Sequence, residues 1–299
     1  MLQALTDLEN NIHNSFVMCG KNAKEWMRKC ILLLPDIEKY EIWKKKGFES
    51  IYVYAAKLAG MSRNTVDDAL RILRKIEDKP ELIKLVEEKG VNAVRPVVTI
   101  ATGDSAGFWA EKARIMSKNT LETYVREFRT STEIHNTKDY SETVKASNNI
   151  TMELDPEIAQ QLEKLKGDGD WNELMMQFLK MREEKLEEQK PESAECESRY
   201  IPAKIKNFVI ARTNGRCAFP ACNKPLIILH HTQRFALENV HDSDRLHGLC
   251  KAHERIAHLG LIENEELAPK FWKLLAEPDR NAPKYEIDII VNKFRMASG

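Results

Sequence analysis

Two short motifs of this chain read Cys217-Ala-Phe-Pro-Ala-Cys222 and Cys250-Lys-Ala-His253. The first places two thiols across a turn, and the second places a thiol and an imidazole one helical turn apart. Tetrahedral zinc sites are built from two such pairs of soft ligands. Six cysteines in 299 residues are too sparse for a disulfide scaffold, and three of them lie in these motifs. We therefore predict a structural zinc ion that binds both motifs and holds this part of the chain together.

The residues after the second motif predict a helix with two functional faces. Each helical residue turns about 100°, so Cys250 and His253 share one face. Glu254 and His258 are four residues apart and share the adjacent face. One helix can thus hold zinc on one side and offer a carboxylate and an imidazole on the next.

A histidine pair follows an apolar segment with high strand propensity, Leu226 to Leu229. Neighbouring residues of a strand point to opposite faces, so His230 and His231 cannot both serve one atom. We expect one of them to bind a metal while the other addresses a water molecule.

Together these residues resemble a known family. Gly215 to Cys222, the pair His230-His231, Leu249 to His253 and then His258 look like the zinc-containing HNH (ββα-metal) endonucleases of bacteria and their mobile elements. The lead-in from Ser198 to Ala203 also resembles the start of that module. Gly47 to Ile51 and Ala59 to Ser62 are similar to a subgroup with a long helical N-terminal region.

The resemblance implies a role for each matching residue. His230, Glu254 and His258 are implied to bind a catalytic divalent metal, with Mg²⁺ or Mn²⁺ as our expectation, and His231 is implied to be the general base. The family usually has an asparagine five residues before the helix cysteine, where this chain has Arg245. Either Arg245 or Asn239 is expected to take over the role of that asparagine in orienting the loop.

The N-terminal part, 1–130, has apolar residues at helical spacing and predicts an all-α region. It contains a near repeat, in which Ser62 and Ser117 each precede a helix start of Arg/Lys-Asn-Thr type. A helix-turn-helix would present Arg63, Asn64, Lys118 and Asn119 to DNA, whereas a simple bundle would leave them as capped surface residues.

The rest of the chain divides by composition. We predict a polar linker over 131–150, a strand-helix-helix spacer or dimerisation element over 151–197, the HNH module over 198–262 and a helical tail over 263–299. In the tail, Glu265 to Leu275 and Lys284 to Arg295 have helical patterns. The predicted fold class is mainly α, with a small C-terminal ββα-metal module.

The charge pattern favours a polyanionic partner for the module. Total charge is balanced, with 46 basic and 46 acidic residues, but Arg199 to Gly260 holds ten basic and four acidic residues. No apolar run reaches the length of a membrane span and the N-terminus does not look like a secretion signal, so we expect no membrane partner and a cytoplasmic protein.

Three interpretations stay open on the sequence alone. The leading one is a DNA endonuclease whose helical region supplies DNA contacts or forms a homodimer. The second is a zinc-stabilised DNA-binding protein that has kept the fold and lost catalysis, which Arg245 favours. The third is an RNA nuclease, because phosphodiester chemistry is shared and no residue of the motifs recognises a 2′-hydroxyl.

Overall fold

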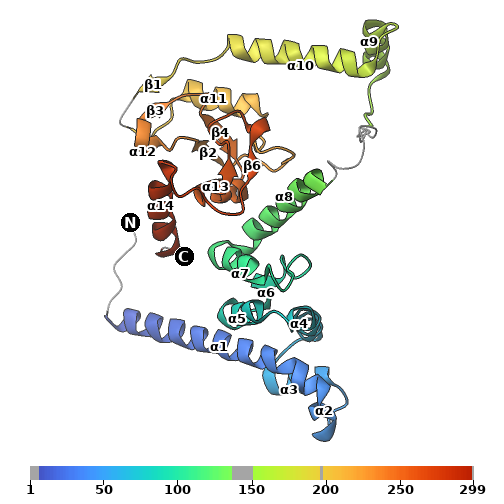
Figure 1. The fold of residues 1–299 in the computed structure, drawn as a ribbon, viewed down its shortest axis with the longest axis vertical. Coiled ribbons are helices and arrows are strands. Elements are labelled where there is room, and N and C mark those ends of the chain that lie inside the picture. The colour runs from blue at the N-terminus through green and yellow to red at the C-terminus, as the bar shows by residue number, and fades with distance from the viewer. Residues whose placement is uncertain (1–6, 137–150, 196–197, 298–299) are drawn as a thin grey trace. The chain divides into compact units, whose positions relative to one another are not determined.

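The computed structural model describes residues 7–136, 151–195 and 198–297 (Figure 1). The chain divides into two compact units, Met1–Val125 and Arg126–Gly299. Helices dominate both units, and the strands of the described residues are short and all lie after residue 193, which confirms the predicted fold class. Among the described helices, none is long and apolar enough to cross a membrane.

In its described residues, the first unit is a bundle of helices. They are α1 (Asp7–Lys39), α2 (Ile42–Lys45), α3 (Ile51–Ala59), α4 (Arg63–Ile76), α5 (Pro80–Lys89), α6 (Val91–Val94), α7 (Ala106–Ile115) and the start of α8 (Lys118–Asn136). The helix α1 packs on α4 and α5, and α5 packs on α7. Val66, Leu82 and Tyr124 are fully buried and belong to its core.

The two predicted helix starts have the expected caps. Ser62 Oγ accepts a hydrogen bond from the Thr65 amide at 3.2 Å, and Ser117 Oγ accepts one from the Thr120 amide at 3.3 Å. The four side chains that follow these serines are exposed, namely Arg63, Asn64, Lys118 and Asn119. They are therefore accessible to a ligand, and a role in nucleic-acid binding stays a prediction.

Before the zinc motifs, the second unit contains α9 (Pro156–Lys166) and α10 (Trp171–Glu188). The expected linker begins later than predicted, because α8 continues to Asn136, and its remaining residues, 137–150, lie outside the described residues. The expected strand over 151–154 is not formed. Strand pairing there requires a partner strand, which a dimer of the ribbon type would take from a second copy.

The region of the zinc motifs folds as a hairpin followed by a helix. Strand β2 (Ile228–His231) pairs antiparallel with β4 (Leu246–Leu249), with His230 opposite His247, and α13 (Lys251–His258) follows at once. The preceding helix α11 (Ala203–Arg212) packs Ile205 and Val209 against Leu246. The predicted order of two strands and a helix is thus present in the structure.

Short elements surround this hairpin. Strand β1 (Ala194–Glu195) pairs with β3 (Val240–His241), and α12 (Phe235–Glu238) lies between β2 and β3 in the chain. The tail contains β5 (Ile262–Glu263), the 3₁₀ turn η2 (Pro269–Phe271), β6 (Lys273–Leu274) and α14 (Lys284–Ala297).

The predicted helix over Glu265 to Leu275 is wrong, whereas the predicted helix over Lys284 to Arg295 is confirmed as α14. Strand β5 pairs with β6, so that Ile262 lies opposite Leu274. Proline lacks an amide hydrogen, and Pro269 therefore opens a 3₁₀ turn where a longer helix would need that donor. The Trp272 side chain of this segment is buried.

One glycine of the hairpin is required by its packing. A Cβ atom on Gly248 would lie 1.8 Å from Leu226 Cδ1 and 2.5 Å from Leu226 Cγ. We predict that Gly248→Ala lowers the free energy of unfolding by about 1–3 kcal/mol, because the strand or Leu226 must shift. Denaturant unfolding of the zinc-loaded protein measures this.

The double variant Leu226→Ala/Gly248→Ala is the control. It removes the clashing atoms and leaves Leu226 Cβ at 3.5 Å, an ordinary contact distance. It should therefore lose less stability than the sum of the two single variants. A Gly248→Ala protein as stable as the wild type contradicts this account of the hairpin.

Candidate functional site

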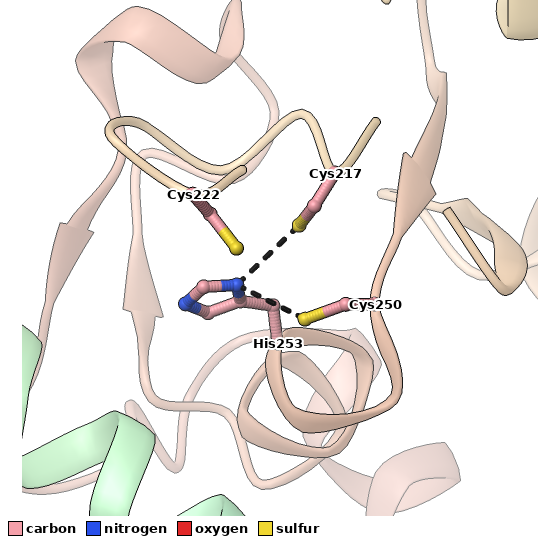
Figure 2. Close-up of side chains that lie close together, drawn as sticks. All are labelled: Cys217, Cys222, Cys250 and His253. Atoms are coloured by element: carbon pink, nitrogen blue, oxygen red, sulfur yellow. Dashed lines mark hydrogen bonds between the residues drawn. The ribbon is translucent and has the colours of Figure 1, made fainter. Parts of the chain in front are cut away.

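The four predicted zinc ligands converge on one point. Cys217, Cys222, Cys250 and His253 are all buried, and their ligand atoms lie within 4.8 Å of one another. His253 Nδ1 lies 3.4 Å from the sulfur of Cys217 and 3.4 Å from that of Cys250. Figure 2 shows the imidazole nitrogen facing the thiols. Among the described residues, this is the one group of three or more His, Cys, Asp or Glu with such a geometry.

Local structure explains why these ligands meet. Ala221 has a left-handed backbone, with φ of 57°, and the turn that results brings Cys222 back toward Cys217. The Ala218 amide donates to the Gly248 carbonyl at 2.8 Å, which ties the cysteine loop to strand β4. The ring of Phe219 stacks on His253 with centroids 4.0 Å apart, which fixes the orientation of the imidazole.

The donor set fits a structural zinc. Three thiols and one imidazole make the Cys₃His combination of closed tetrahedral sites. A hydrogen bond between two of the thiols raises the pKa of Cys217 and lowers that of Cys250. A zinc ion bound here would bond to thiolates, so its binding would release the thiol protons.

The structure also brings together three of the predicted catalytic residues. His230, His231 and His258 line one cavity of about 270 Å³, together with Arg199. The rings of His230 and His258 are 5.0 Å apart at their centroids and nearly perpendicular. His230 is buried and His231 is partly exposed, as the alternation of a strand requires.

Glu254, the remaining predicted metal ligand, does not line this cavity. Its carboxylate pairs with Arg295 of α14 at 2.6 Å and lies 3.3 Å from His258 Nε2. The contact with His258 follows from their four-residue spacing on α13, as predicted. The contact with Arg295 was not foreseen, because the tail offered only a packing pattern.

A buried arginine lies among these residues, and sequence reasoning missed it. The Arg234 guanidinium lies 2.7 Å from Glu265 and 2.7 Å from Asp288, and all three side chains are at most 3% exposed. Arg234 also donates to the carbonyl of Ala257 at 3.0 Å. The only sequence signal was a basic residue four positions after His230, and its two carboxylates come from the tail.

This network engages the histidines that were predicted to bind metal. His230 Nε2 lies 2.5 Å from Glu265 Oε1 and 3.0 Å from Arg234 Nη1, and His258 Nδ1 lies 2.8 Å from Asp288 Oδ1. Burial lowers the pKa of His230 despite its hydrogen bond to Glu265. Burial opposes ionisation of Glu265, yet its bonds to His230 and Arg234 hold its pKa below the usual range.

The described arrangement therefore does not fit a second metal. A guanidinium is permanently charged, and it lies within hydrogen-bond distance of the His230 nitrogen that the divalent ion would need. The ligand atoms of His230, Glu254 and His258 are not among those that converge within 4.8 Å. These three side chains are instead held by ionic and hydrogen-bonding partners within the protein.

His231 has a separate environment on the other side of β2. Its Nε2 lies 2.9 Å from His241 Nδ1, and His241 Nε2 lies 3.0 Å from the Ser198 carbonyl oxygen. Burial is the main cause that lowers the pKa of His231 to about 4, so the ring is neutral at pH 7. A neutral imidazole has one nitrogen able to accept a proton.

The residues expected to replace the family asparagine lie near this strand. The Arg245 side chain pairs with Glu238 at 2.6 Å on the surface. The Arg245 carbonyl accepts from the amide of Thr232 at 2.9 Å, directly after His231. Asn239 has a left-handed backbone and ends α12. Arg245 therefore supports the strand through its backbone rather than through its guanidinium.

Comparison with protein-family models, with curated proteins and with solved structures gives no match for this chain. What is shown is a Cys/His cluster that can hold a metal near the C-terminus, beside short strands, in a chain with a helical N-terminal region.

Zinc content tests the metal centre. We expect the purified protein to carry one zinc per chain, and Cys250→Ser to lose most of it, because a hydroxyl is a poor substitute for a thiolate. Elemental analysis after exhaustive dialysis measures this. Cys19→Ser, at an exposed cysteine of α1, is the matched control and should keep full zinc. Equal zinc in both variants is incompatible with the centre.

The buried network makes a stability prediction. Arg234→Met should lower the free energy of unfolding by about 3–5 kcal/mol, since buried Asp288 loses its guanidinium partner and buried Glu265 is left with Lys284. Arg245→Met is the control, because its pair with Glu238 is about half exposed, with side-chain exposures of 51% and 37%. It should cost less than about 1 kcal/mol. Equal losses in denaturant unfolding would falsify the ranking.

Proposed function

We propose that the region around the zinc cluster is an HNH-type endonuclease that hydrolyses DNA phosphodiester bonds, with His231 as general base. The observation that supports the proposal is the shared cavity of His230, His231 and His258 beside the Cys₃His cluster. The cluster joins the cysteine loop to α13, and β2 supplies the histidine pair. This places three imidazoles around one space large enough for a phosphate group.

The charge of the region favours a polyanionic substrate. The sequence from Arg199 to Gly260 contains ten basic residues and four acidic ones. Arg199 is exposed and lines the cavity with His231. A guanidinium binds phosphate oxygens in a bidentate manner, so Arg199 is suited to hold the scissile phosphate. The exposed polar residues at the starts of α4 and α8 would add contacts to the DNA backbone.

His231 supplies the proton transfer of the proposed reaction. The ring is neutral at pH 7, so one nitrogen has a lone pair that can take a proton from a water molecule, although the lowered pKa makes the ring a weaker base. The water oxygen forms a bond to phosphorus, the bond to the 3′ oxygen breaks, and that oxygen leaves with a proton from solvent. His231 and Arg199 supply the base and the phosphate contact.

A second candidate is favoured by Arg234. Its contacts to His230 and Glu265 take up the nitrogen that a catalytic ion would need. A zinc-stabilised protein that binds DNA without cleaving it is compatible with such a filled site. Both candidates share the zinc cluster and the excess of basic residues, so an activity assay is needed to distinguish a nuclease from a DNA-binding protein.

A plasmid assay separates the two candidates. Zinc-loaded wild type with added Mg²⁺ or Mn²⁺ should nick supercoiled DNA, and His231→Ala should be slower by about 10²–10⁴-fold with unchanged DNA affinity, since only proton transfer is lost. His13→Ala, at an exposed histidine of α1, is the matched control and should match the wild type.

Each outcome has a clear meaning. Equal cleavage by wild type and His231→Ala rules out His231 as the base. DNA binding by both proteins without cleavage by either supports the second candidate. A mobility-shift assay at fixed salt gives the affinities.

A further inference from the structure

We propose that His241 is a positioning residue that fixes which nitrogen of His231 accepts the proton; the inference rests on the proposed function. His241 lies in β3, a strand that no sequence motif singled out, and it is fully buried. Its ring links His231 on one side to the backbone carbonyl of Ser198 on the other. A relay of three groups therefore ends at the proposed base.

The donor and acceptor roles in this relay follow from chemistry. The Ser198 carbonyl can only accept, so His241 Nε2 must carry a hydrogen to bond it at 3.0 Å. In a neutral ring His241 Nδ1 is then an acceptor, and it receives the hydrogen of His231 Nε2 at 2.9 Å. His231 Nδ1 is left with the lone pair. The relay thus selects the tautomer of His231 in which Nδ1 is the base.

Packing holds the relay in this geometry. Phe235 stacks on His241, with centroids 4.7 Å apart and ring planes within 15°. The Phe235 ring also lies beside His231, with centroids 5.4 Å apart. Pairing of β3 with β1 sets His241 opposite Ala194. The imidazole of His241 is therefore held by a ring on one face and by a strand pair along its backbone.

The relay also supplies an orienting contact that Arg245 does not make through its side chain, which is engaged with Glu238. Groups that hydrogen-bond to a metal-ligating histidine fix its tautomer and ring orientation, and their loss typically costs about 10–100-fold in affinity or activity. The same orienting effect applies to a histidine that transfers a proton. A loss of this size is expected when His241 can no longer accept from His231.

Two substitutions separate the acceptor from the packing. His241→Phe keeps a flat ring that can stack on Phe235, but it has no acceptor. His241→Asn loses the ring, yet its side-chain oxygen can lie near the former Nδ1 position and accept from His231. Zinc content and circular dichroism establish that each variant is folded.

The first measurement is independent of activity. Long-range ¹H–¹⁵N spectra of imidazole-labelled, zinc-loaded protein at pH 7 report the tautomer of each histidine, with His231→Ala used to assign the signal. We expect the Nε2–H tautomer for His231 in the wild type and in His241→Asn. In His241→Phe we expect a mixture of tautomers.

The second measurement is plasmid cleavage. His241→Phe should lower kcat by about 10–100-fold with KM little changed, and His241→Asn should recover most of that loss. An Nδ1–H tautomer in the wild type, or a His241→Phe protein that matches the wild type in both measurements, overturns the inference. Absence of cleavage by the wild type, with the expected tautomers observed, overturns the proposed function and leaves the relay as a structural feature.

Discussion

The Cys₃His cluster is the constraint on which the C-terminal region depends. Its ligands come from a loop and from the first turn of α13, which are separated in the chain by the whole β2–β4 hairpin. Buried apolar side chains on α13 and after it, such as Ile256, Leu261 and Trp272, pack in the same region. A tetrahedral ion at the cluster would add its binding free energy to this packing, because the ligands come together only in the folded chain.

The alternation of β2 gives its two histidines different chemistry. His230 faces inward, where carboxylates and a guanidinium surround it. His231 faces the other way and meets a second imidazole. Adjacent residues of the same type therefore have different partners, which are Glu265 and Arg234 for His230 and His241 for His231. The cavity that both line joins these two environments.

The local features of the site could be predicted from the sequence, and the distant ones could not. The zinc ligands, the hairpin strand before His230, the shared face of Glu254 and His258, and the serine caps of α4 and α8 all follow from spacing along the chain. Arg234, His241 and Asp288 carry no such signal, because their main partners lie in other elements of the chain. The helix predicted over Glu265 to Leu275 failed for a related reason, since strand pairing and burial of Trp272 outweighed a local periodicity.

The helix α14 belongs structurally to the hairpin region despite its distance in the sequence. Asp288 neutralises Arg234, Arg295 neutralises Glu254, and Asn292 donates to the carbonyl of His258 at 2.6 Å. A fragment that stopped near Gly260 would lack both Glu265 and Asp288, the carboxylates that neutralise Arg234. A piece of this protein that keeps the buried ion pairs around the histidines therefore extends through α14.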